Sequence, residues 1–307
     1  MKFIILNMKR ISILFPALAF LVVGTLSAQQ PSAARVDSTT TALDSKIEVY
    51  QKENIPFKKP VPYAPVREAD ILWEYTVWVE VDLRQKQNFP LYFPTNPRTI
   101  GSRVNFFTLL MQGIERGEIT PYDPFPVSDE FALKTTWEEI RTNPSIQGAD
   151  RTEQQTSIYT GNDTSIFIKG KNLLEDENIQ RIVVKEKRYF DKKHSTYNVR
   201  VIGICPYFYY LREGADQPSK IPVCWIYMDE ARPLLSRHAA FNDFNEAQNI
   251  SYDDFFMQHR YDGRIIKQGN VYNNRSIQEY ASGLDALYES ERIKNEILNR
   301  EQDLWEY

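Results

Sequence analysis

Three apolar runs between residues 179 and 229 constrain the fold more than any other part of this sequence. Each is rich in the Val, Ile, Tyr and Phe residues that favour strands: Arg181–Phe190, Tyr197–Leu211 and Ile221–Met228. Two segments that contain turn-forming residues, Asp191–Thr196 and Arg212–Lys220, separate the runs. Consecutive strands joined by short turns pair antiparallel. The sequence therefore predicts an antiparallel β-meander over about residues 179–229.

The middle run is apolar on both of the faces that a strand presents. One face carries Val199, Val201, Cys205 and Tyr207, and the other carries Ile202, Ile204, Phe208 and Tyr210. A strand of this kind is covered on both sides. Pro206 and Pro222 have no N–H to donate, so we expect a bulge or an edge where they lie.

Helical patterns flank the meander. Phe106, Leu109, Leu110 and Ile114 have helical spacing between Ser102, a predicted N-cap, and Gly117. Ser128 is predicted to cap a second short helix that runs through Trp137 and Ile140. Arg67–Lys86 has an apolar helical face, although its β-branched residues make a strand the competing interpretation. The capping-box pattern Ser276–Glu279 predicts the start of a long final helix. We expect an α+β fold: the meander packed with several helices and a long C-terminal helix.

The N-terminus has the order of a secretory signal. Lys9 and Arg10 precede the apolar run Ile11–Leu26, which ends in the small pair Ser27–Ala28. A membrane anchor is the alternative, but the run has 16 residues and an anchor usually needs about 20. We expect cleavage after Ala28. Removing three basic residues and no acidic one changes the net charge from −4 to −7, which argues against a nucleic-acid partner.

The remaining chain divides into three predicted parts. Residues 29–66 form a flexible arm that ends in a proline-rich stretch, residues 67–275 form the α+β core, and residues 276–307 form the C-terminal helix. The apolar side chains between the prolines, which include Phe57 and Tyr63, suggest that the arm lies on a partner.

Two cysteines, Cys205 and Cys224, lie in neighbouring strands of the predicted meander. If the turn centres between residues 214 and 215, the two face each other across a hairpin, where a disulfide is feasible in an exported protein. The alternative is a pair of buried free thiols, which behave as small hydrophobic residues.

A search for catalytic chemistry gives little. His194, His238 and His259 lie in separate segments without metal-ligand spacing, and no phosphate-binding loop or nucleophile elbow is present. Asp229 and Glu230 follow a strand, as a glycosidase pair can, but turn and cap roles explain them equally well. We predict no catalytic residue, no metal site and no cofactor.

Aromatic residues are the unusual component, because 40 of them make up 13% of the chain. Tyr and Trp are enriched at protein interfaces. We therefore predict that partner contacts come from the arm, from the aromatic segment near residue 75 and from the end of the chain. The candidate contact residues are Phe57, Tyr63, Trp73, Trp78, Leu304 and Trp305.

Together, several short blocks resemble one known family, the gliding-motility family GldN/PorN. The blocks are Arg67–Trp73, Val77–Trp78, Val81–Arg84, Asn88–Pro94, Tyr189–Lys192, Val199–Ile204, Trp225–Tyr227, Ser251–Phe256 and Asn270–Asn273. They spread over roughly residues 45–280. The family has no cysteine pair of this kind, so the resemblance does not support the disulfide.

The resemblance implies a non-enzymatic subunit of the type IX secretion system of Bacteroidetes. Such subunits lie in the periplasm at the inner face of the outer membrane. They self-associate in a ring with a PorK/GldK-like lipoprotein, and they contact a PorM/GldM-like motor subunit. The lipoprotein would supply the membrane anchor that this chain lacks.

The competing hypothesis is a periplasmic carbohydrate-binding or glycan-cleaving protein that uses aromatic platforms and the Asp229–Glu230 pair. Alanine at both positions separates the two hypotheses: loss of glycan turnover with intact secretion favours the glycan hypothesis.

Overall fold

The computed structural model describes residues 57–95, 103–125, 130–143, 146, 178–210, 219–241, 245 and 250–303, and the backbone alone of 151–156 and 163–168. The predicted signal segment and residues 29–56 lie outside this part of the chain. The chain divides into two compact units, residues 1–36 and 37–307, and all of the described residues belong to the second.

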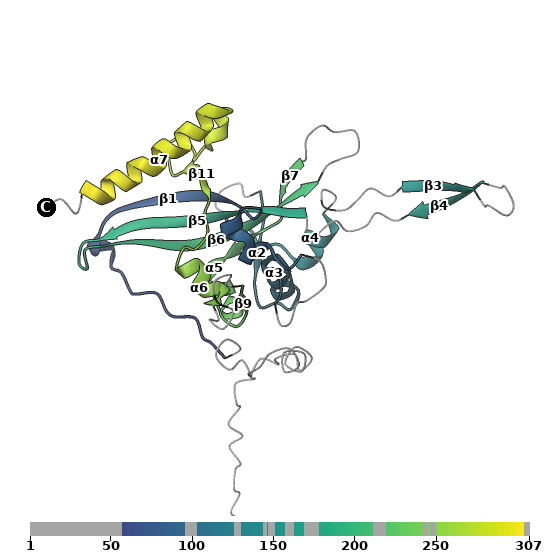
Figure 1. The fold of residues 1–307 in the computed structure, drawn as a ribbon, viewed down its shortest axis with the longest axis horizontal. Helices are drawn as coiled ribbons and strands as arrows, with labels where there is room; N and C mark the ends of the chain where they lie inside the picture. Colours follow the sequence, from purple (N-terminus) through teal and green to yellow (C-terminus); the bar gives the residue numbers. More distant parts are fainter. Residues whose placement is uncertain are drawn as a thin grey trace, which may run out of the picture. The chain divides into compact units, whose positions relative to one another are not determined.

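A seven-stranded antiparallel sheet organises the fold (Figure 1). Its strand order is β11-β1-β5-β6-β8-β2, and β7 also pairs with β6. The strands are β1 (Ile71–Asp82), β2 (Pro121–Tyr122), β5 (Ile179–Asp191), β6 (Thr196–Tyr210), β7 (Ser219–Pro222), β8 (Trp225–Tyr227) and β11 (Arg264–Gln268). Two further two-stranded sheets pair β3 (Arg151–Thr156) with β4 (Asp163–Ile168), and β9 (Ala239–Ala240) with β10 (Ile250–Ser251).

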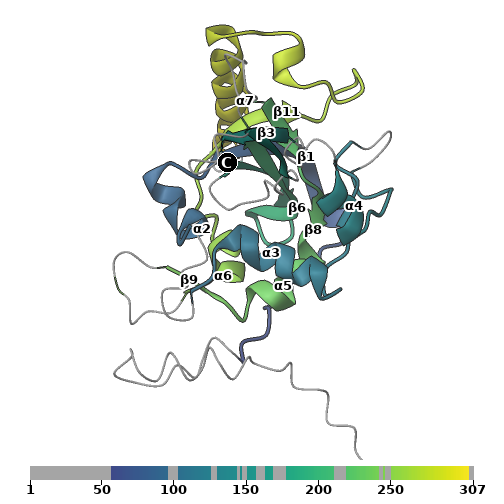
Figure 2. The ribbon, with the colours of Figure 1, turned by 90° about the vertical axis from the view of Figure 1, so that its right-hand side faces the viewer.

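The helices complete the α+β class that the sequence predicts. They are α2 (Phe89–Tyr92), α3 (Phe106–Glu115), α4 (Trp137–Thr142), α5 (Met228–Leu235), α6 (Tyr252–Met257) and α7 (Leu284–Asp303), with single 3-10 turns η1 (Glu68–Asp70), η2 (Lys86–Asn88) and η4 (Ile277–Glu279). In both ribbon views α3, α5 and α6 lie together on one side of the sheet, and α7 lies along β11 (Figures 1 and 2). None of the helices in the described part of the chain combines the length and hydropathy that a membrane span requires.

The predicted meander is present, and the sheet extends beyond it. β5 and β6 pair antiparallel as predicted. The third predicted strand, Ile221–Met228, is instead divided into β7 and β8, which both pair antiparallel with β6, and Met228 begins α5. Of the two interpretations of Arg67–Lys86, the strand is confirmed, because Ile71–Asp82 forms β1, which pairs with β5 along its length. One face of β1 carries Val77, Val79 and Val81, which belong to the larger hydrophobic cluster. The other face carries Trp78, which belongs to a smaller cluster. Pairing with a distant strand therefore overrides the local helical spacing.

Three helix starts differ from the predicted ones. The N-cap of α4 is Thr136, which forms a capping box with Glu139, and not Ser128. The N-cap of α3 is Asn105, whose Oδ1 accepts a hydrogen bond from the Phe107 N–H at 2.8 Å, and not Ser102. Ser276 and Glu279 do form the expected capping box, but it opens the single turn η4. Gly283 then takes a φ of +60°, which breaks the chain direction, and α7 begins only at Leu284.

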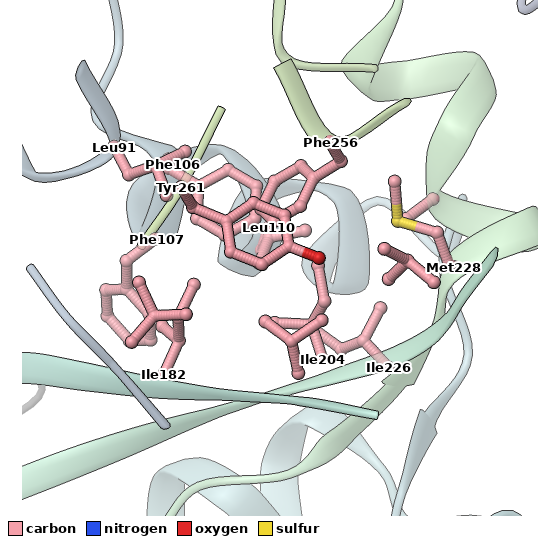
Figure 3. Packing of buried hydrophobic residues seen from close by; sticks show 14 of the residues in the cluster. Leu91, Phe106, Phe107, Leu110, Ile182, Ile204, Ile226, Met228, Phe256 and Tyr261 are labelled. Atoms are coloured by element: carbon pink, nitrogen blue, oxygen red, sulfur yellow. The ribbon is translucent and has the colours of Figure 1, made fainter. Parts of the chain in front are cut away.

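The main core lies between the sheet and the helices (Figure 3). Phe106 and Leu110 of α3 meet Phe256 of α6, Ile204 of β6 and Ile226 of β8, and each of these side chains is at most 1% exposed. The opposite face of the sheet carries a smaller cluster of Trp78, Tyr122, Val183, Cys205 and Trp225. Both faces of the middle strand are thus covered, as its sequence predicts.

The hairpin between the two cysteines is centred as predicted. Tyr207 pairs with Pro222 and Tyr209 with Lys220, a register that centres the hairpin between residues 214 and 215. Cys205 and Cys224 are both buried free thiols in the structure. Burial raises the pKa of Cys224 to about 12 and that of Cys205 well above its usual value. A disulfide between them stays a prediction.

We expect neither thiol to react with a maleimide in the native protein at pH 7, because a buried protonated thiol is a poor nucleophile. Rapid native labelling by mass spectrometry would contradict this expectation. Labelling in denaturant with and without reductant then tests the bridge: two labels without reductant mean free thiols, and none means a disulfide.

Candidate partner-binding surface

The loop between β11 and α7 presents apolar and aromatic side chains to solvent. We call residues 269–283 the aromatic loop. Val271 is 91% exposed, Tyr272 is 63% exposed and Tyr280 is 44% exposed. Neighbouring exposed apolar residues of this kind mark interaction sites on soluble proteins. The aromatic loop is therefore the strongest candidate for a partner-binding surface.

Asn270 holds the first half of the aromatic loop in shape. Its Nδ2 donates to the Gln268 and Arg275 carbonyls at 3.0 Å each, and its Oδ1 accepts from the Tyr272 N–H at 3.0 Å. The Asn270 N–H donates to Asn274 Oδ1 at 3.0 Å. Asn273 and Asn274 have φ values of +55° and +54°, a conformation that Asn tolerates better than most residues. The exposed side chains are thus displayed on a hydrogen-bonded turn.

The second half of the aromatic loop is anchored at Ser276 and Ile277. Ser276 donates from its N–H and its Oγ to Glu279 Oε1 at 2.9 Å each. Ile277 is 3% exposed and belongs to the main core. This anchor places Tyr280 beside α7, where its hydroxyl donates to Glu289 Oε1 at 3.1 Å.

Arg275 links the two exposed tyrosines. Its guanidinium lies 4.6 Å from the ring centroid of Tyr272 and 4.7 Å from that of Tyr280. These three residues line a shallow pocket of 220 Å³ together with Gln268, Asn270, Glu289, Arg292 and Ile293. Hydrogen bonds from Arg292 lower the pKa of Glu289, so its carboxylate stays charged beside the pocket. Tyr and Arg are the side chains most enriched at interface hot spots, and the pocket can therefore receive a side chain of a protein partner.

Replacing Asn270 by alanine should loosen the aromatic loop without unfolding the protein. The change removes three side-chain hydrogen bonds at a partly exposed site, so we expect a loss of about 1 kcal/mol in the free energy of unfolding. Amide hydrogen exchange of residues 270–276 should become faster, while that of the β5 and β6 strands stays unchanged. Unaltered exchange in the loop would contradict this role of Asn270.

The candidate contact Tyr63 contacts the protein's own core. Its ring lies between the guanidinium groups of Arg200 and Arg232, which are 4.1 and 4.2 Å from the ring centroid. Arg232 is itself buried and pairs with Asp253 at 2.8 Å. Burial raises the pKa of the Tyr63 hydroxyl. Tyr63 thus attaches the end of the arm to β6 and α5.

Two further contacts hold the same part of the arm. Lys58 Nζ pairs with Asp254, and the Val61 carbonyl accepts from Arg232. The burial of Asp254 opposes its ionisation, but hydrogen bonds from Lys58 and Ser251 outweigh burial and lower its pKa. Phe57, by contrast, is 76% exposed. Of the two arm residues predicted as contacts, only Phe57 is thus free to meet a partner without rearrangement of the described residues.

The two tryptophans of β1 differ in burial. Trp78 is 4% exposed, and its Nε1 donates to Glu130 Oε1 at 2.9 Å. The Lys267 Nζ atom lies 4.2 Å from the centroid of the Trp78 ring. It is a core residue of the second face. Trp73 is partly buried against Tyr75 and Tyr197, and its buried indole N–H has no hydrogen-bond partner among the described residues.

Leu304 and Trp305 lie outside the described residues. The contact residues predicted from the sequence do not include Tyr272, Arg275 or Tyr280, although Asn270–Asn273 is one of the blocks that carry the family resemblance. The sequence does contain a signal for this exposed site, because Val271 and Tyr272 lie between the turn-forming Asn270 and Asn273. Apolar residues within a turn have no strand or helix face through which to become buried.

Asp229 and Glu230 have separate structural partners at the start of α5. Asp229 pairs with Arg200 at 2.7 Å and accepts from the Tyr227 hydroxyl at 3.1 Å. Glu230 accepts from the Thr120 N–H at 3.1 Å. Carboxylates also stabilise the first turn of a helix. No group of three His, Cys, Asp or Glu side chains suited to a metal occurs within the described ranges.

The comparison with protein families gives one match. Residues 66–306 match the family described as "Gliding motility associated protein GldN". This range contains the whole sheet, the aromatic loop and α7. No curated protein matches the chain.

Proposed function

The chain belongs to the GldN family of gliding-motility-associated proteins, and on that premise we propose that it is a non-enzymatic structural subunit of the type IX protein secretion and gliding machinery. In this proposal it forms a periplasmic ring with a PorK/GldK-like lipoprotein of the outer membrane. It also contacts a PorM/GldM-like motor subunit on the periplasmic side of the inner membrane.

The aromatic loop is the structural observation that carries this proposal. A subunit of a large assembly needs extensive interfaces, each above ~1,000 Å². Tyr272, Arg275 and Tyr280 have the composition of an interface centre, and Asn270 holds them in a preformed conformation. Preorganisation reduces the entropy lost on binding. We assign this surface to the lipoprotein partner.

The N-terminal sequence supports a periplasmic location. The basic residues, the apolar run and the small pair before residue 29 direct export. The protein is then held at the inner face of the outer membrane through its lipidated partner. The structural partners of Asp229 and Glu230 argue against their use as a glycan-cleaving pair.

Sedimentation of the co-expressed pair tests the proposal. The chain and its lipoprotein partner should sediment together as a multimegadalton particle, and mass spectrometry of envelope pull-downs should recover the motor subunit. A chain that stays monomeric at every ratio of the two proteins would overturn the ring assignment.

A further inference from the structure

Helix α7 has two apolar faces, and the fold uses only one of them. Ile293 and Ile297 are 2% and 3% exposed and belong to the main core. Leu284, Leu287 and Leu298 are 69%, 47% and 47% exposed. A helix at a protein surface usually has one apolar stripe and a polar opposite face. The second stripe is therefore not explained by the packing of α7 on β11.

The second stripe has a charged centre between apolar ends. Leu287, Glu291, Lys294 and Leu298 follow one another at intervals of four, three and four residues, which places them on one side of the helix. Glu291 and Lys294 are exposed and line a pocket that Glu80 and Arg264 also line. Neither of them forms an ion pair with another described residue. Four other charged residues of α7 pair with one another: Arg292 pairs with Glu289 and Glu296, and Arg300 pairs with Glu296.

We propose that this stripe binds the α7 helix of a second copy of the chain in antiparallel orientation. In the two-fold arrangement, Leu287 packs on the partner's Leu298, and Glu291 faces the partner's Lys294. The same two contacts recur with the copies exchanged. A two-fold interface requires such self-complementarity, because one surface patch must match itself.

Charge selects this register over its alternatives. In a parallel pair, Glu291 would face the partner's Glu291, and Lys294 would face the partner's Lys294. An antiparallel pair that places Leu284 on the partner's Leu298 again brings Glu291 against its own copy. Like charges directly opposed are destabilising. Only the register that joins Leu287 to the partner's Leu298 pairs both charges favourably.

The contact is small. Residues 284–301 overlap in this register, a helix length of about 27 Å. Interfaces below ~1,200 Å² of total buried surface are typical of weak association. We therefore expect the isolated chain to dimerise weakly, with a dissociation constant of about 10–100 μM. The contact goes beyond the ring assignment and does not depend on it, because it joins two copies without the lipoprotein.

Charge reversal tests the register. In sedimentation equilibrium of the mature chain, Glu291→Lys and Lys294→Glu should each weaken dimerisation at least tenfold. The double variant E291K/K294E should restore it, because the exchanged charges pair again. Asp303→Lys is the matched control: it makes the same change in charge as Glu291→Lys but lies away from the stripe, so dimerisation should persist.

Cross-linking locates the contact independently. A chain with both Leu287→Cys and Leu298→Cys should form a covalent dimer under mild oxidation, whereas the wild type, whose two described cysteines are buried, should not. A wild-type chain that stays monomeric at 200 μM, or a double charge variant that fails to recover, would overturn the proposal. Either result would leave co-sedimentation with the lipoprotein unaffected.

Discussion

Replacing Glu80 by alanine is expected to lower the free energy of unfolding by about 3 kcal/mol. The Glu80 side chain is 2% exposed, and cations from three strands surround it. Lys220 of β7 pairs with Oε1. Arg264 of β11 donates to Oε2 from Nε at 2.8 Å and from Nη2 at 2.6 Å, and Arg181 of β5 lies 3.4 Å away. The truncation leaves these cations without their shared buried partner.

Glu74→Ala is the matched control for Glu80→Ala. Glu74 lies on the same strand and pairs with Lys187 at 2.6 Å, but the two side chains are 37% and 41% exposed. An exposed ion pair contributes less than about 1 kcal/mol. Urea denaturation of both variants compares the two sites. Equal losses at the two positions would contradict the importance of the buried cluster.

The contribution of Glu80 should also depend on pH. Burial alone would raise its pKa, but the hydrogen bonds and charges of Lys220 and Arg264 outweigh burial and lower the pKa below its usual 4.5. A carboxylate with a depressed pKa in the folded state stabilises the protein fully above its unfolded-state pKa. This stabilisation is lost as the pH falls through the folded-state pKa. The difference in stability between wild type and Glu80→Ala should therefore be constant above about pH 5.5 and shrink below pH 4.5.

The second large effect is expected at the aromatic loop. Combined Tyr272→Ala and Tyr280→Ala should weaken binding to the proposed lipoprotein partner by at least 100-fold, because interface hot spots contribute about 2 kcal/mol or more each. Both residues are exposed, so the unfolding free energy should change by less than about 1 kcal/mol. Titration of the purified variant against the lipoprotein, with denaturation as the folding control, measures the two quantities.

Phe125→Ala is the control for the loss of an exposed aromatic side chain. Phe125 is 64% exposed and lies outside the aromatic loop. Its truncation should leave lipoprotein binding within about twofold of wild type. If the tyrosine variant bound as tightly as wild type, the aromatic loop would not be the lipoprotein site. The exposed Phe57 of the arm would then be the next residue to test.

The local parts of the fold follow from the sequence. Alternating apolar residues and turn formers predict β5, β6 and the run that contains β7 and β8, because strand alternation and turn chemistry depend on residues close together in the chain. The register of the β6–β7 hairpin follows from the centre of a single turn. The capping box at Ser276 is a property of four residues. Each of these features needs no information from a distant segment.

Tertiary structure decides what depends on distant pairing. Ile71–Asp82 has helical spacing, yet it becomes β1 because β5, about 100 residues later, offers it a strand partner along its length. The same pairing buries Trp78 and gathers Lys220, Arg264 and Arg181 around Glu80. Ile277 is buried, but the break at Gly283 leaves Leu284 and Leu287 exposed. Hydrophobicity determines that a side chain favours burial, but only the completed sheet and helix packing determine which side chains become buried.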